Sequence, residues 1–173
     1  MPAVAKKKPT IVLQRTRHPL QESNRIEVVR ALQPLQSGCI ELYLQLKNAH
    51  WNVRGPAFAS LHRVFDETSN DALQFGDELA ERMAIVGGEP IATVQKIAAV
   101  PQLADTPSGM KSQDEFIKVT VDRLSYFTGM VRDSLSYFER NNDPVTNDIC
   151  LKGLAALEKK LWLIESHLSS KIV

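Results

Sequence analysis

Cysteine is scarce in this chain of 173 residues, which contains only Cys39 and Cys150. Two cysteines so far apart are too few for a disulfide framework or a cysteine-based zinc site. Each lies in an apolar helical pattern, so we expect both to be buried in a reducing compartment. Long hydrophobic runs are also missing, and no apolar stretch follows the N-terminal lysines. The sequence therefore favours a cytoplasmic protein over a membrane-spanning or ordinary secreted one.

Acidic residues are absent from the first 21 positions, which carry five cations, among them Lys6, Lys7 and Lys8. The other residues carry 16 cations and 20 anions, a balance of −4. The first segment also contains three prolines and shows no helical periodicity. We therefore predict a basic, flexible arm over residues 1–21 and a single globular domain over residues 22–173.

Strand-like alternation is lacking, whereas four long stretches show the apolar spacing of helices. They cover residues 22–51, 58–86, 112–139 and 144–169. The connection over residues 89–111 is rich in proline, with a short helix expected near residues 92–99. Pro34 should kink the first helix or break a turn of it. The prediction is an all-α, up-down four-helix bundle with one long crossover.

Two histidines and three carboxylates stand out as candidate metal ligands: His50, His62, Asp66, Asp77 and Glu81. The last four form two pairs on the second helix, each with a spacing of four residues. The first pair is His62 and Asp66, and the second pair is Asp77 and Glu81. At 100° per residue, the four side chains fall within an arc of about 100° around the helix axis, so they share one face of the helix. Carboxylates at this spacing are often just a solvated surface. Here, however, residues 65–79 lack the cations that a salt-bridged surface carries, so the anions repel one another unless a cation joins them.

The two pairs cannot bind one metal ion within a single straight helix. Their centres are about 22 Å apart at 1.5 Å per residue, whereas metal ligands lie about 2 Å from the ion. Two copies of this helix, antiparallel about a two-fold axis near residues 71–72, would bring the first pair of each copy to the second pair of the other. The ligands suit iron and, less specifically, manganese or zinc, and they favour redox chemistry. The absence of a Glu-x-x-His motif argues against a di-iron centre within one chain.

At this point the sequence closely resembles the Dps family, the DNA-binding proteins from starved cells, also called mini-ferritins. The resemblance covers about residues 22–170. It rests on Asn48-Ala-His-Trp-Asn-Val-Arg-Gly55, on the two spaced pairs, on Asp77-Glu-Leu-Ala-Glu-Arg82, on Gly87-Gly88 and on Leu161-Trp-Leu-Ile-Glu-Ser166. The sequence departs from the family at Pro34, which interrupts a helix that is usually continuous, and in an arm with fewer lysines than strong DNA binders have.

The resemblance implies a ferritin-like subunit that assembles into a hollow dodecamer. It implies iron between two-fold-related subunits, with His50, His62 and Asp66 from one chain and the second pair from the other. Such proteins oxidise Fe(II), usually with hydrogen peroxide, and store ferric mineral. Trp51 matches a tryptophan proposed to donate electrons, whereas we expect Trp162 to be in the core. The resemblance also makes Asp143 and Asp148 candidates for a pore through which iron enters.

Two further functions remain open at this stage. The three lysines of the arm are candidates for salt-sensitive, sequence-independent contacts with DNA phosphates, although a tail that only aids solubility is as plausible. A structural, DNA-compacting nucleoid protein whose interface metal is not catalytic is the alternative to a ferroxidase. An oxygenase with a di-iron centre inside one subunit is a third, weaker alternative.

Overall fold

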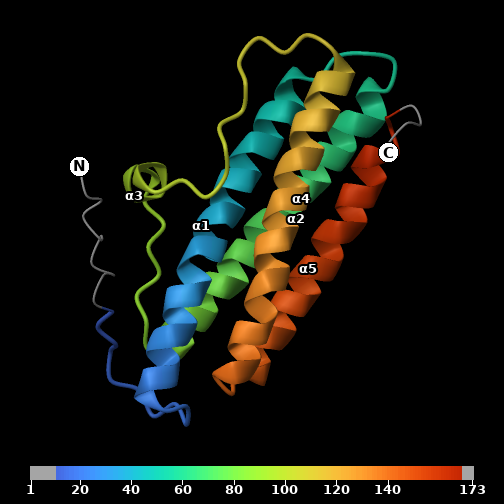
Figure 1. The fold of residues 1–173 in the computed structure, drawn as a ribbon. Coiled ribbons are helices and arrows are strands. Elements are labelled where there is room, and N and C mark those ends of the chain that lie inside the picture. Colours follow the sequence, from blue (N-terminus) through green and yellow to red (C-terminus); the bar gives the residue numbers. More distant parts are fainter. Residues whose placement is uncertain (1–10, 169–173) are drawn as a thin grey trace, which may run out of the picture.

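The computed structural model describes residues 11–168, which fold into five helices without any strand. The helices are α1 (Glu22–Asn52), α2 (Phe58–Ile85), α3 (Val94–Ala99), α4 (Gln113–Arg140) and α5 (Pro144–Glu165). The four long helices lie side by side, and the crossover that carries α3 runs along the outside of the bundle from the end of α2 to the start of α4 (Figure 1). The predicted all-α four-helix bundle, with its short helix in the long connection, is confirmed.

The core lies between the four long helices, because each of them turns an apolar stripe inward. Its largest fully buried side chains come from all four helices and include Leu32, Leu42, Phe65, Leu79, Phe127, Phe138 and Leu157. The two cysteines, Cys39 and Cys150, belong to the same core, as predicted. Burial raises the pKa of both thiols, that of Cys150 to about 12. Neither cysteine is therefore a nucleophile at neutral pH.

The ends of the helices follow signals that are visible in the sequence. Ser112 and Glu115 form a complete capping box, in which each side chain bonds the backbone of the other residue at the start of α4. After α2, the chain turns at Gly87, whose φ of 90° is in the left-handed region that glycine favours. The N–H of Gly88 then donates to the carbonyl of Met83 over 2.8 Å, closing the end of the helix. The observed end of α5, at Glu165, comes four residues before the predicted one.

Helix α1 continues through Pro34 without a break, so the predicted broken turn is wrong, whereas the predicted kink stays a prediction. Proline removes one backbone donor from the helix, but packing on both sides compensates, since Leu32 and Leu35 are buried in the core. The side chain of Gln33 also exchanges two hydrogen bonds with the backbone of Ile91, over 2.8 and 2.9 Å. Tertiary contacts thus hold the helix together at the position where local propensity is weakest.

The described half of the predicted flexible arm is attached to the bundle. The N–H of Gln14 donates to the carbonyl of Gly87 over 2.7 Å, and Ile11 and Leu13 pack against the core. Residues 11–20 thus have defined contacts with the bundle, and the flexibility of the arm stays a prediction. The lysines predicted to contact DNA, Lys6, Lys7 and Lys8, lie outside the described residues.

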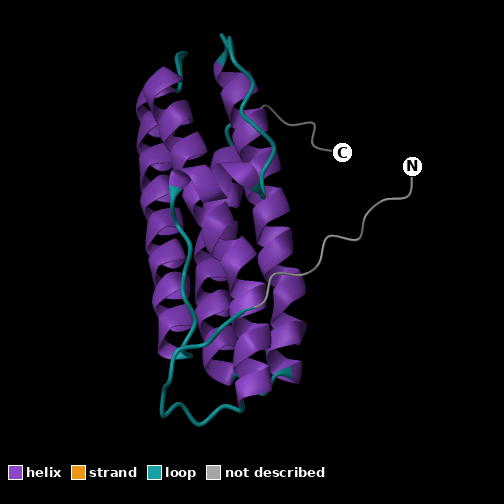
Figure 2. Cartoon of the chain, turned by 90° about the vertical axis from the view of Figure 1, so that its left-hand side faces the viewer, coloured by secondary structure: helices purple, strands orange, loops and turns teal. Residues whose placement is uncertain are grey.

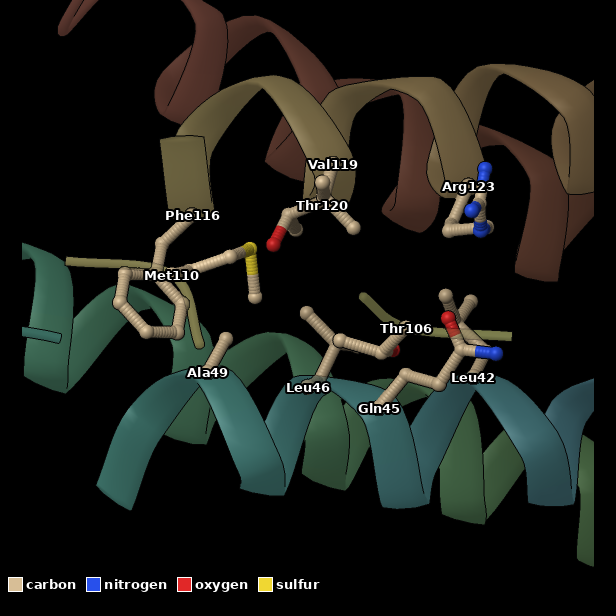
Figure 3. A pocket seen from close by; sticks show the side chains of 10 residues that line it. All are labelled: Leu42, Gln45, Leu46, Ala49, Thr106, Met110, Phe116, Val119, Thr120 and Arg123. Atoms are coloured by element: carbon tan, nitrogen blue, oxygen red, sulfur yellow. The ribbon is translucent and has the colours of Figure 1, made fainter. Parts of the chain in front are cut away.

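The crossover runs along the bundle (Figure 2), where side chains of α1 and α4 bind its backbone. The Glu41 carboxylate accepts hydrogen bonds from the N–H groups of Gln102 and Leu103, and Arg123 donates to the carbonyls of residues 104 and 105. Between α1, α4 and residues 106–110 of the crossover lies a small cavity of about 10 Å³, which has room for a single water molecule (Figure 3). None of the described helices combines the length and apolar content needed to span a membrane.

Candidate metal centre

His50 and His62 meet at one end of the bundle, where α1 turns into α2. Their rings are stacked, with centroids 3.7 Å apart. The Nδ1 atom of His50 lies 2.7 Å from the carbonyl oxygen of His62, and the Nδ1 atom of His62 lies 2.9 Å from the carbonyl oxygen of His50. A carbonyl oxygen only accepts hydrogen bonds, so each Nδ1 carries the hydrogen. Both Nε2 lone pairs are then available to a metal, the tautomer that histidine ligands commonly adopt.

The turn between the two helices places this histidine pair. Gly55 has a φ of 142°, which favours glycine, and Val53 just before it is fully buried. The side chain of Gln113, in the first turn of α4, accepts a hydrogen bond from the N–H of Ala57 over 3.0 Å. The ring of Phe58 lies against His62, with centroids 5.1 Å apart. The histidines are thus held by the turn, by each other and by α4.

Asp66 lies one turn along α2 from His62, and its carboxylate is bound by a lysine of α1. The Nζ atom of Lys47 is 2.6 Å from Oδ1 of Asp66. The hydrogen bond from Lys47 is the largest cause of the lowered pKa of Asp66, so this carboxylate is ionised at neutral pH. Sequence reasoning missed Lys47, because it considered cations within α2 only. The lysine is one turn before His50 on α1, and this spacing is the signal that could have pointed to it.

Asp77 and Glu81 are on the same helix but far from the histidines, and both side chains are exposed. Within residues 11–168, neither carboxylate forms a hydrogen bond or an ion pair. No group of three histidine, cysteine or acidic side chains in that part of the chain is close enough to hold a metal ion. One chain therefore brings the two histidines together and places Asp66 one helical turn beyond His62, whereas the second pair lies further along α2.

The candidate pore residue Asp143 has another role, and that prediction is corrected. Its side chain is 1% exposed and accepts a hydrogen bond from Arg82 over 2.7 Å. It also caps α5 by accepting from the backbone N–H and the hydroxyl of Thr146. Burial acts to raise the pKa of Asp143, but the bonds from Thr146 and Arg82 outweigh it and hold the pKa below its ordinary value. A carboxylate buried in this way cannot line a pore.

The other candidate residues lie on the surface of the single chain. Asp148 is exposed and pairs with Lys152, whose Nζ atom is 2.7 Å away. Trp51 is 60% exposed, and the Nζ atom of Lys47 lies 5.8 Å from the centre of its ring. Trp162 is 59% exposed, so its predicted place in the core is wrong. It lies beside the buried stripe of α5, which runs through Leu157 and Ile164.

Comparison with known proteins agrees with this architecture. Residues 29–171 match the family model of the ferritin-like domain. A DNA protection during starvation protein of Brevibacillus brevis is 33% identical over 129 residues, which cover 75% of this chain and 86% of the relative. The chain belongs to the Dps family. A second protein of that name, from Agrobacterium fabrum, is 27% identical over 91% of this chain and 97% of its own length.

Solved structures of the Dps family share the fold over almost the whole chain. The Dps homologue of the archaeon Halobacterium salinarum superposes with a TM-score of 0.87. It is 25% identical, and the match covers 98% of this chain and 94% of that one. The resemblance deduced from the histidine motif and the two spaced pairs is thus confirmed at the level of the family.

Proposed function

We propose that this Dps-family protein detoxifies and stores iron, oxidising Fe(II) at sites shared by two copies of the chain. The observation that carries the proposal is the reciprocal bonding of His50 and His62. It leaves two Nε2 atoms available beside the ionised carboxylate of Asp66. Such a group is half of a metal site, and it lies on the chain that also carries an exposed pair, Asp77 and Glu81, without partners of its own among the described residues.

A second copy of the chain, related by a two-fold axis, supplies the missing ligands in this proposal. The axis passes near the middle of α2, where Leu73 is 40% exposed on the face that carries both pairs. Leu44, Trp51 and Phe58 are further large apolar side chains exposed on α1 and α2. Burying them between copies is favourable, and a two-fold contact creates two equivalent sites at once. Six such dimers make up the dodecameric shell that the resemblance implies.

The donor set suits Fe(II) as a substrate. Neutral imidazoles and carboxylates are borderline and hard ligands, and the three carboxylates offset the charge of the ion. Zinc or manganese would compete for the same atoms. In the proposed reaction, two Fe(II) ions give up one electron each, and hydrogen peroxide takes both electrons with two protons to form two water molecules. No hydroxyl radical is released, which is how the reaction would protect DNA.

Two other residues have proposed roles in this reaction. Trp51 follows His50 directly, and we propose that its exposed ring donates an electron to the centre. Asp148 remains the candidate for drawing iron through a pore, although its ion pair with Lys152 reduces its charge effect. Replacing Trp51 with phenylalanine should alter the products of peroxide reduction, whereas the Asp148→Asn change should only slow the uptake of iron.

The ferroxidase proposal is tested by loading the purified oligomer with Fe(II) without oxygen and then adding peroxide. The absorbance of ferric iron is recorded for the wild type, for a His62→Ala/Asp66→Ala variant and for a Glu67→Gln control. We expect fast oxidation by the wild type and the control. The rate of the double variant should be at least about 100-fold lower, because two side chains that bind the metal directly are lost. Equal rates in all three proteins would overturn the proposal and favour a structural role for the metal.

Binding of DNA belongs to the proposal as a secondary function. A shell would present twelve basic arms, so weak phosphate contacts by Lys6, Lys7 and Lys8 add up through multivalency. A gel shift at low salt compares the intact protein with one lacking residues 2–8. Binding that is lost with the deletion, and that weakens with added salt, supports the role of the arm. Equal shifts for both proteins would remove the arm from the proposal.

A further inference from the structure

Lys47 is the only cation of the described chain bound to a side chain of the candidate metal centre. Its ammonium group donates to Oδ1 of Asp66 over 2.6 Å. The side chain is only 18% exposed, because it lies between α1 and α2. A metal ion bound to the histidines and Asp66 would therefore have a fixed positive charge as its neighbour.

We infer that Lys47 is an internal competitor of the metal ion for Asp66 and so sets the affinity of the site. One carboxylate oxygen is already engaged, and a divalent ion must either share Asp66 with the ammonium group or displace it. Both outcomes weaken binding, the first through repulsion between like charges and the second through the loss of the ion pair. The inference rests on the proposed function and concerns the regulation of the same site.

The ammonium group of Lys47 also has a second partner in the structure. The ring of Trp51 lies one turn along α1, with its centre 5.8 Å from Nζ of Lys47, within the range of a cation–π contact. A lysine that releases Asp66 keeps this ring as a favourable partner while the carboxylate turns to the metal. The competition is thus reversible, and a site held at moderate affinity passes its iron on after oxidation instead of retaining it.

The test measures the binding of Co²⁺, which is a redox-stable substitute for Fe(II), to the assembled oligomer by titration calorimetry. We expect Lys47→Met to bind Co²⁺ about tenfold more tightly than the wild type, because the competing charge is removed while the length of the side chain is kept. Lys47→Arg keeps the charge and should stay within about twofold of the wild type. The matched control is Lys160→Met, which removes a similarly buried lysine that bridges α2 and α5 through Glu67.

A double-mutant cycle makes the inference specific to Asp66. In an Asp66→Asn background, the Lys47→Met change should tighten Co²⁺ binding clearly less than in the wild-type background, because only the repulsion between the ammonium group and the ion remains. Unchanged or weaker binding by Lys47→Met alone would overturn the inference and assign Lys47 a merely positioning role.

A His62→Ala variant distinguishes a failure of the proposed metal centre from a failure of the proposed competition. If it binds Co²⁺ as well as the wild type, the proposed metal centre itself is wrong. If His62→Ala loses binding but Lys47→Met does not bind Co²⁺ more tightly, the metal centre is supported and the competition by Lys47 is refuted.

Discussion

The two halves of the candidate centre differ in how much of their geometry one chain provides. His50 and His62 are stacked and exchange hydrogen bonds with each other's backbone, and Asp66 is bound by Lys47. Asp77 and Glu81 are exposed and have no such partner among the described residues. The first half is therefore organised before any partner arrives, whereas the second half depends on the helix alone for its position.

The exposed pair Asp77 and Glu81 is nevertheless next to a buried ion pair that anchors α2, formed by Arg82 and Asp143. Arg82 follows Glu81 directly but turns inward, where it reaches Asp143 and the hydroxyl of Thr146. This buried pair fixes the last turns of α2 against the start of α5. The comparison teaches that a ligand without partners can still be well placed, provided that the helix which carries it is anchored on its opposite face.

The largest expected effect comes from breaking that anchor. Arg82→Met leaves the buried carboxylate of Asp143 without its charge partner and should lower the free energy of unfolding by about 3–5 kcal/mol. The neighbouring change Glu81→Gln should stay within about 0.5 kcal/mol of the wild type, because it alters an exposed side chain. Denaturant titrations at one fixed protein concentration compare the two. Similar losses for both variants would contradict the proposed anchoring role of Arg82.

A smaller effect distinguishes the two halves directly. His50→Ala removes a stacked ring and the hydrogen bond from its Nδ1 to the carbonyl of His62, so the free energy of unfolding should fall by about 1–2 kcal/mol. Asp77→Ala should change the stability by less than about 0.5 kcal/mol, since no contact within the described chain is lost. Thermal unfolding of the metal-free proteins measures the difference. Equal stabilities would show that the histidine pair is not organised in advance.

The buried carboxylate of Asp143 should also make the free energy of unfolding depend on pH in the acidic range. The pKa of Asp143 is lower in the folded chain than the ordinary value of about 3.9. Its stabilisation is therefore complete above about pH 4 and is lost as the pH falls through the lowered folded value. We expect the stability of the wild type to decline in this acidic range more steeply than that of Asp143→Asn. Parallel declines, followed by denaturant titration at each pH, would count against this carboxylate as the cause.

The smallest effect concerns the core behind the centre. Cys39 and Cys150 are fully buried, and their thiol pKa values are raised. A thiol reagent at neutral pH should react with neither cysteine in the native protein and with both after unfolding. Rapid reaction of the native protein, recorded by absorbance, would mean that the bundle opens far more readily than its packing indicates.

The sequence predicted the helices well because their signals are local. Apolar spacing, the capping box at Ser112 and the glycines after α2 act within a few residues, so periodicity and end signals are sufficient. Pro34 is the exception, since the hydrogen bonds of Gln33 to the distant Ile91 offset its local cost. Trp162 was misplaced because it was judged by residue type, although its position on α5 lies beside the buried stripe.

The features of the site that the sequence did not predict depend on contacts between different helices. The spacing of the two pairs on α2 indicated the candidate ligands and their separation. It did not indicate Lys47, which comes from α1 and lies 19 residues before Asp66 in the sequence. The cap role of Asp143 was readable from the following proline, but its burial against Arg82, 61 residues away, was not. Such pairs arise from the packing of the bundle and leave no local pattern.

The central claim, that each site is shared by two chains, is tested most directly by complementation. One variant carries His62→Ala/Asp66→Ala and the other Asp77→Ala/Glu81→Ala, so neither alone has a complete site. The two are dissociated, mixed in equal amounts and reassembled, and Fe(II) oxidation by peroxide is recorded. Random pairing restores one complete site in half of the dimers, so the account predicts recovery of about one quarter of the wild-type rate. A mixture as inactive as its separate components, with assembly intact, would contradict it.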